Sequence, residues 1–177
     1  MISTPLPRLR VVCLAAMLLV FTACDVINPD ETVILTPSFT YDFAFNVEEG
    51  DGTLRAESTN APSISQLLER TFRADEVISA TVTSAQLERS LPPGRALNTI
   101  FDTATLDLVN GTSVTVAAMS SPPGSRSGSM SVNSPDITGL FQGDDIPAAL
   151  ELDFITDEQE QYAFTANVRF RIEVEGV

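Results

Sequence analysis

The sequence contains no histidine, no lysine and no tryptophan, and its cysteines are Cys13 and Cys24. Without histidine, Ser-His-Asp and Cys-His nucleophile systems are excluded, and without lysine a Ser-Lys pair is excluded as well. Zinc and copper sites normally use histidine or cysteine, so neither metal is expected. The glycines fall in turn-like segments, and none forms a phosphate-binding loop. We therefore predict that the protein is not an enzyme and has no cofactor or metal.

Positive charge is also scarce. Ten arginines stand against 24 acidic residues, which gives a formal net charge of −14 at pH 7. Such a surface repels DNA, RNA and anionic headgroups, so nucleic-acid binding is not expected. An excess of acids without lysine is typical of a halophilic source or of a GC-rich genome, and both stay open. The hydrophobic content of 44% is that of a globular chain.

The N-terminal segment carries the most informative pattern. Arg8 and Arg10 precede an apolar run from Val11 to Ala23, and Cys24 follows directly. A charged region, an apolar region and a small residue before a cleavage point are the parts of a secretory signal. A membrane span needs roughly 20 apolar residues. Asp25 comes too early for one, which argues against a spanning anchor.

The residues Phe21-Thr22-Ala23-Cys24 resemble the lipobox of bacterial lipoproteins, although Phe21 replaces the usual Leu or Val. The resemblance implies that the Cys24 thiol is acylated, that residues 1–23 are removed, and that the new N-terminus is acylated too. Cys24 would then be the lipid attachment site. The protein would be anchored in the cell envelope, facing the periplasm or the exterior, and which membrane holds it stays open. An ordinary secretory signal with a chance cysteine is the alternative.

Cleavage before Cys24 removes 23 of the 177 residues and leaves enough chain for one domain with a core. Eight arginines would then face 24 acids, a net charge near −16. Residues 24–37 are interpreted as a tether in which Val33-Ile34-Leu35 can add a short edge strand. Residues 38–177 are interpreted as a single β-sandwich domain.

Alternating apolar and polar residues predict most of the strands. They cover residues 39–47, 54–56, 77–87, 104–108, 114–118, 129–133, 150–154 and 162–174. A change of phase in the third of these predicts a bulge near Ser84. Turns are predicted at residues 50–52, 91–94 and 110–111, a loop from Ser120 to Ser131, and one helical turn within residues 135–141. A short helix is predicted from Ser63, where Ser63 and Gln66 fit a capping box.

These strands and turns predict an all-β fold: an antiparallel β-sandwich of seven to nine strands with one short helix, or alternatively an open barrel. The segment 54–56 is expected to pair with 39–47. The segments 150–154 and 162–174 are expected to form a hairpin. Their shared even-numbered apolar positions would then face one core, with Arg169 and Arg171 exposed and near the acids of the preceding strand.

Three acidic groups are candidate calcium ligands, because calcium takes six to eight oxygens, often from loops. They are Glu48-Glu49 with Asp51, Asp144-Asp145, and Asp157-Glu158 with Glu160. None has EF-hand spacing, so we interpret them as solvated turns. A carboxylate-based glycosidase needs only two acids, but sugar sites usually add aromatic platforms. Tyr41 and Tyr162 both fall on apolar strand faces, and burial is predicted for each.

The predicted mature chain resembles uncharacterised β-rich lipoproteins of Gram-negative bacteria. The resemblance rests on an aromatic first strand, the short helix at Ser63, the strand at Phe101-Asp102-Thr103-Ala104, the segment Ser134-Pro135-Asp136-Ile137, and a long alternating last strand. It implies the fold and the location. The expected function is a non-enzymatic binding or envelope-assembly module with an unidentified envelope protein as partner. A calcium- or glycan-binding module and a carboxylate-based hydrolase are the alternatives.

Self-repulsion within so acidic a chain predicts that its stability depends on salt, because added ions screen the repulsion. The melting temperature should rise between low salt and about 1 M NaCl. Equal melting temperatures would count against a halophilic origin. A much larger rise with millimolar calcium than with matched magnesium would favour the calcium-binding alternative.

Overall fold

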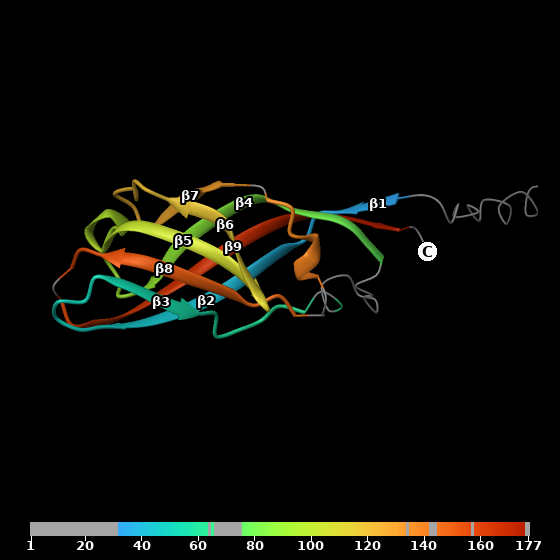
Figure 1. Ribbon diagram of the computed structural model, residues 1–177. Coiled ribbons are helices and arrows are strands. Elements are labelled where there is room, and N and C mark those ends of the chain that lie inside the picture. Colours follow the sequence, from blue (N-terminus) through green and yellow to red (C-terminus); the bar gives the residue numbers. More distant parts are fainter. Residues whose placement is uncertain are drawn as a thin grey trace, which may run out of the picture. The chain divides into compact units, whose positions relative to one another are not determined.

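The computed structural model describes residues 32–63, 65, 76–133, 135–141, 145–156 and 158–175. Nine strands cross this part of the chain, with the 3-10 helices η2 (Leu97–Thr99) and η3 (Thr138–Leu140) between them (Figure 1). The strands are β1 (Thr32–Leu35), β2 (Ser38–Val47), β3 (Thr53–Glu57), β4 (Val77–Leu91), β5 (Phe101–Asn110), β6 (Thr112–Met119), β7 (Ser127–Val132), β8 (Ala148–Phe154) and β9 (Glu160–Glu175). In these ranges, no helix has the length and apolar character needed to cross a membrane.

The strands form two antiparallel layers. Sheet A contains β1, β2, β9 and β4, and sheet B contains β6, β5, β8 and β3. Strand β7 joins them, because its first part pairs with β4 and its last two residues pair with β6. Figure 1 shows β5, β8 and β3 lying across β4, β9 and β2. The sheet does not close on itself, and its two facing layers are those of the predicted antiparallel β-sandwich (Figure 1).

Strand β9 is the central strand of sheet A. One edge pairs with β2 and β1 in succession, and the other edge pairs with β4. Every even-numbered side chain from Tyr162 to Val174 is buried, and the odd-numbered ones between them are partly or fully exposed. The alternation that predicted this strand from the sequence is therefore confirmed.

The predicted hairpin between residues 150–154 and 162–174 is wrong. β8 pairs with β3 and β5 in sheet B, whereas β9 belongs to sheet A. The apolar side chains of β8 and β9 nevertheless meet in one core, because the two sheets face each other. The ring centroids of Phe154 and Tyr162 are 5.6 Å apart. An apolar strand face requires burial, and a facing sheet satisfies this requirement as well as a paired neighbour does.

Two more predicted pairings fail for the same reason. β3 pairs with β8, while β2 pairs with β9. Arg171 forms its ion pair with Glu173 of its own strand at 2.6 Å, and not with the acids of β8. Arg169 is exposed, as predicted, and its Nε donates to the Ser38 hydroxyl at 3.5 Å.

Strand β4 contains the predicted irregularity. Its register with β9 shifts between Val82 and Ser84, which keeps the apolar side chains on both sides of the shift in the core. A second shift lies between Val77 and Ser79. It leaves Ile78 exposed.

The predicted turns are confirmed where the chain reverses between β5 and β6. Asn110 pairs with Thr112, and Gly111 between them has φ of +70°, a left-handed conformation that glycine adopts without strain. Gly94 ends the turn after β4 with φ of +89°. η3 supplies the helical turn predicted within residues 135–141.

Two predicted boundaries differ from those in the structure, and one predicted element lies largely outside the described residues. Residues 32–35, inside the predicted tether, form β1 and pair with β9, as the edge-strand option anticipated. The predicted loop from Ser120 ends earlier, because β7 begins at Ser127. The predicted helix lies outside the described residues apart from Ser63 and Ser65.

Aromatic rings join the two layers. Phe45 of β2 contacts Phe154 of β8 and Phe164 of β9, with centroids 5.5 and 5.9 Å apart. Phe164 also contacts Phe101 of β5 at 5.9 Å. Edge-to-face pairs of this kind add to the stabilisation that burial provides. Phe164 therefore packs sheet A against sheet B through Phe101.

Replacing Phe164, which is 1% exposed, with Ala should lower the free energy of unfolding by about 3–5 kcal/mol, because the ring leaves a cavity between the sheets. Arg169→Ala, on the same strand but exposed, should cost under about 1 kcal/mol. Denaturant unfolding of both variants measures the difference. Similar losses in the two variants would contradict the two-layer core.

Candidate functional site

The residue with the strongest sequence prediction, Cys24, lies outside the described residues. Its acylation therefore stays a prediction. The described part of the chain begins at Thr32, with the strand that follows the remaining tether.

Two of the acidic residues considered as calcium ligands, Asp51 and Glu158, have protein partners. Asp51 accepts a hydrogen bond from the Glu48 backbone N–H at 2.8 Å and donates its own N–H to the Glu48 carbonyl at 3.1 Å. Glu158 forms an ion pair with Arg95. Asp144 and Asp157 lie outside the described residues. Within the described ranges, no three His, Cys, Asp or Glu side chains are grouped as metal ligands.

Tyr41 and Tyr162 are both fully buried, as predicted. Neither hydroxyl has a hydrogen-bond partner. Burial raises the pKa of the Tyr41 hydroxyl well above its ordinary value, because the charged form is poorly solvated there. Both rings belong to the core between the sheets and are not surface platforms for a sugar.

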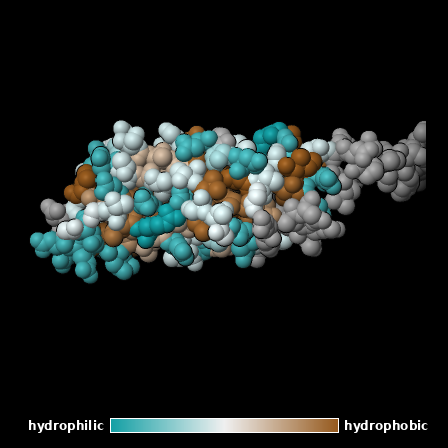
Figure 2. Space-filling model, in the orientation of Figure 1, coloured by the Kyte–Doolittle hydropathy of each residue, from teal (hydrophilic) through white to brown (hydrophobic). Residues whose placement is uncertain are grey.

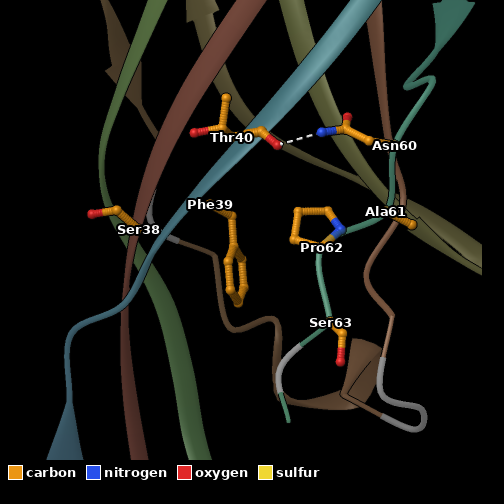
Figure 3. Close-up of a pocket in the computed structure, with 7 residues that line it drawn as sticks. All are labelled: Ser38, Phe39, Thr40, Asn60, Ala61, Pro62 and Ser63. Carbon is orange, nitrogen blue, oxygen red and sulfur yellow. Dashed lines mark hydrogen bonds between the residues drawn. The ribbon is translucent and has the colours of Figure 1, made fainter. Parts of the chain in front are cut away.

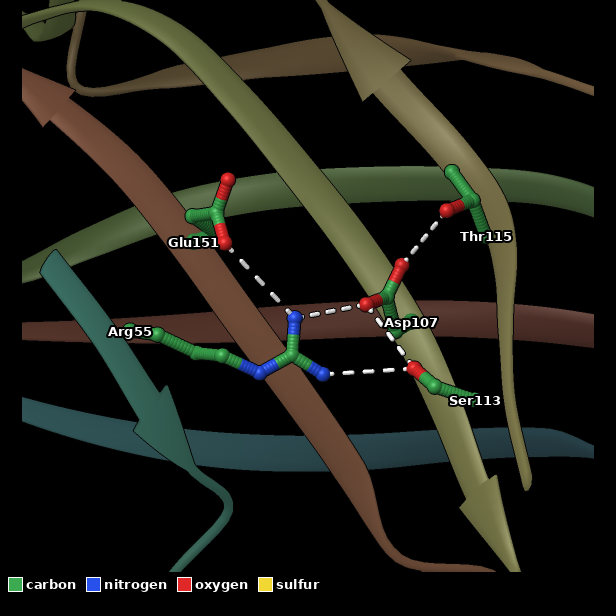
Figure 4. Close-up of polar contacts among 5 residues, drawn as sticks. All are labelled: Arg55, Asp107, Ser113, Thr115 and Glu151. Atoms are coloured by element: carbon green, nitrogen blue, oxygen red, sulfur yellow. Dashed lines mark hydrogen bonds and ion pairs between the residues drawn. The ribbon is translucent and has the colours of Figure 1, made fainter. Parts of the chain in front are cut away.

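A polar network that the sequence analysis missed crosses the outer face of sheet B (Figure 4). Asp107 of β5 is at its centre and is 6% exposed. Its Oδ2 accepts hydrogen bonds from Arg55 Nη1 at 2.6 Å and from the Ser113 hydroxyl at 3.0 Å. Its Oδ1 accepts a hydrogen bond from the Thr115 hydroxyl at 2.7 Å. Arg55 Nη1 also lies 3.8 Å from Glu151. The network thus links β3, β5, β6 and β8.

Burial of the Asp107 carboxyl tends to raise its pKa. The hydrogen bonds from Arg55, Thr115 and Ser113, together with the Arg55 charge, outweigh this effect and hold the pKa below its ordinary value. Asp107 is therefore ionised at neutral pH, and its two oxygens are occupied. Such a carboxylate holds strands together and is poorly suited to act as a general acid or base.

A second polar arrangement covers the free edge of β2 (Figure 3). The side-chain amide of Asn60 donates from Nδ2 to the Thr40 carbonyl at 3.0 Å and accepts the Asp42 N–H at 2.9 Å. The Thr59 N–H donates to the Asp42 carbonyl at 2.7 Å. These bonds replace those of a neighbouring strand and protect an edge that would otherwise be open to pairing.

Beside this cover lies a cavity of about 280 Å³. Figure 3 shows the Phe39 ring and Pro62 in it, and no charged side chain is among the described residues of its lining. The lining is Ser38, Phe39, Thr40, Asn60, Ala61, Pro62 and Ser63. Its described lining offers hydroxyl and amide groups and an aromatic ring, and no ionisable side chain.

Arg89 is the other residue that the sequence analysis missed. It lies on β4 in phase with the core residues Ala85 and Leu87, and it is 5% exposed. The sequence did contain a signal for this residue: Arg89 is a charged residue at a position of β4 where the alternation predicts an inward-facing side chain. The predicted bulge obscured this signal, because the phase of β4 after Ser84 was uncertain from the pattern alone.

No family model matches the chain, and no curated protein matches it. Three solved viral structures have partly similar backbones. The cyanophage Pam1 capsid asymmetric unit is 12% identical with a TM-score of 0.39, covering 78% of this chain and 85% of that chain. Infectious bursal disease virus Gx strain is 13% identical with a TM-score of 0.40, covering 82% and 32%. The Helicobacter pylori bacteriophage KHP30 capsid is 11% identical with a TM-score of 0.34, covering 82% and 99%. At these scores, the similarities carry no conclusion about function.

Asp107→Asn should lower the free energy of unfolding at pH 7 by about 1–3 kcal/mol, because a charge-assisted network loses its anion. The loss should shrink below about pH 4, since the contribution of a carboxyl with a lowered pKa disappears as pH falls through that pKa. Denaturant unfolding of the variant and the unchanged protein at pH 7 and below about pH 4 measures the loss at each pH. Asp102→Asn, exposed on the same strand, is the matched control. A loss that is the same at both pH values would contradict the network's role.

Proposed function

We propose that the chain is an extracytoplasmic lipoprotein, anchored to a membrane through Cys24, whose β-sandwich is a non-enzymatic binding or envelope-assembly module. The observation that carries this proposal is the sequence Phe21-Thr22-Ala23-Cys24 at the end of an apolar signal. A globular β-sandwich follows it within a few residues.

The short link between Cys24 and the first strand supports an anchored module. Residues 25–31 separate the cysteine from Thr32. Seven residues span at most about 25 Å when fully extended. The sandwich would thus stay near the bilayer, while its negative charge disfavours lying flat on anionic headgroups.

Exposed apolar side chains lie at the β1 end of the sandwich. Val33, Ile34 and Ile78 are exposed, and the register of β1 and β4 on β9 places them around Glu173. Figure 2 shows brown side chains among hydrophilic ones at this end of the visible face. Because β1 directly follows the predicted tether in the sequence, these side chains support contact with an envelope protein close to the membrane.

The chemistry of the chain supports a non-enzymatic role. Histidine and lysine are absent from the sequence, and the predicted acylation would use the one cysteine left after cleavage. The buried carboxylate Asp107 is engaged by three neighbouring side chains. The two tyrosines that would serve a glycan-binding alternative lie in the core. We therefore favour the binding module over the glycan-binding and hydrolase alternatives.

Cys24→Ala should abolish acylation and signal cleavage at this site when the full-length chain is expressed in a Gram-negative host. The protein would then lose its firm hold on the membrane, because several acyl chains bind a bilayer firmly and the variant carries none. Mass spectrometry and membrane fractionation measure both effects. Cys13→Ala is the matched control, since Cys13 lies inside the signal and should be dispensable.

A Cys24→Ala protein that matures normally and stays tightly bound to membranes would refute the proposal. Loss of acylation and membrane binding in the Cys13→Ala control would also contradict it, because it would show that attachment needs Cys13.

A further inference from the structure

Arg89 is a buried cation without a partner for much of its charge. Its Nε and Nη1 atoms are inaccessible to solvent and form no hydrogen bond. A guanidinium is charged at every relevant pH, so deprotonation cannot relieve the burial. Burying an unpaired charge is unfavourable unless an opposite charge or other acceptors are supplied.

Arg89 lines a cavity at one end of the sandwich. The cavity has a volume of about 270 Å³ and lies between the turn after β4 and the loop before β7. Two backbone hydrogen bonds hold these segments together: the Arg89 N–H donates to the Arg126 carbonyl, and the Leu97 N–H donates to the Ser125 carbonyl, both at 2.9 Å. The lining residues are Arg89, Gly94, Arg95, Ala96, Gly124, Ser125 and Arg126.

The charges around this cavity are positive, in contrast to the chain as a whole. Three arginines line it, and none of the described lining residues is acidic. Arg95 is paired with Glu158, and Arg126 Nη2 is paired with Glu88 at 2.8 Å. Among the described residues, Arg89 has no such pair. The cavity therefore retains about one uncompensated positive charge in a protein of net charge −14.

The cavity and β1 lie at opposite ends of the sandwich. Arg89 is in register with Phe164 of β9, whereas β1 pairs with residues 172–175. Eight to eleven residues of extended strand place these points roughly 30 Å apart. Figure 1 shows the turns beyond β4 and before β7 at the end away from β1.

The geometry points to an oxyanion-binding site in this cavity, in which the Arg89 guanidinium binds a carboxylate or phosphate group. Nη2 is the guanidinium nitrogen left to donate to an oxygen of such a group, because Nε and Nη1 are inaccessible to solvent. The positive charge is delocalised over the whole guanidinium and therefore attracts an anion at this position. Arg95 and Arg126 at the rim are already paired with Glu158 and Glu88, so Arg89 supplies the positive charge that is left for a ligand. This inference goes beyond the proposed anchored module and holds whether or not Cys24 is acylated.

Nuclear magnetic resonance of the full-length protein in a neutral detergent tests this directly. The sequence has ten arginines and no lysine, so the guanidinium Nε–H region contains few signals. The Arg89 signal should shift in a saturable way as inorganic phosphate or sodium acetate replaces chloride at constant ionic strength. A response to phosphate alone identifies a phosphate site, and a response to acetate alone identifies a carboxylate site.

Arg89→Met removes the charge while keeping the length of the side chain, and affinity for the responding anion should fall at least tenfold. Arg169→Met is the matched control, because it makes the same charge change at an exposed site outside the cavity. Its affinity should stay within twofold of the unchanged protein. Arg126→Met, at the exposed rim, should weaken binding about threefold and serves as the second variant if Arg89→Met fails to fold.

The inference is overturned if neither anion produces a saturable shift of the Arg89 signal up to about 50 mM. It is also overturned if Arg89→Met binds as tightly as the unchanged protein, or if Arg169→Met and Arg126→Met weaken binding equally. Those outcomes would mean that the cavity holds water and no specific anion, and that any effect of added anions comes from general charge screening.

Discussion

The structure depends on the burial of one face of β9 between the two sheets. Seven even-numbered side chains, from Tyr162 to Val174, enter the core, and the strand pairs with β2 and β1 on one edge and with β4 on the other. A shift of one residue would expose all seven and bury charged neighbours such as Arg169. Each large side chain contributes roughly 1.5–3 kcal/mol when buried. This constraint fixes the register of sheet A.

The sequence predicted which face of each strand is buried more reliably than which strands pair with one another. The alternation in β2 and β9, the bulge beside Ser84 and the reversal at Gly111 were predictable because each is encoded within a few residues. Pairing of β8 with β9 was predicted and is wrong, because adjacent strands that share a core can lie in opposite sheets. A pattern of apolar residues identifies which side of a strand is buried and leaves open which strand lies beside it.

The polar features were harder to predict than the strands. Asp107 is held by residues from two other strands, β3 and β6, and this proximity exists only after sheet B has formed. Arg89 becomes noticeable once the phase of β4 beyond its bulge is known. Both are charged residues whose side chains are buried in the folded sandwich. The absence of histidine and lysine allowed several classes of catalytic site to be excluded from the sequence alone. The positions of the polar sites could be found only from the folded structure.

The central claim is that β9 lies between β2 and β4, with β8 in the opposite sheet. Interstrand backbone nuclear Overhauser effects measure this most directly. The account predicts contacts of Phe164 with Phe43 of β2 and of Ala166 with Leu87 of β4, and contacts of Leu152 with Leu54 and Ala104 within sheet B. A ladder of backbone contacts between β8 and β9 would contradict the account, because it would restore the hairpin and remove the two-layer core.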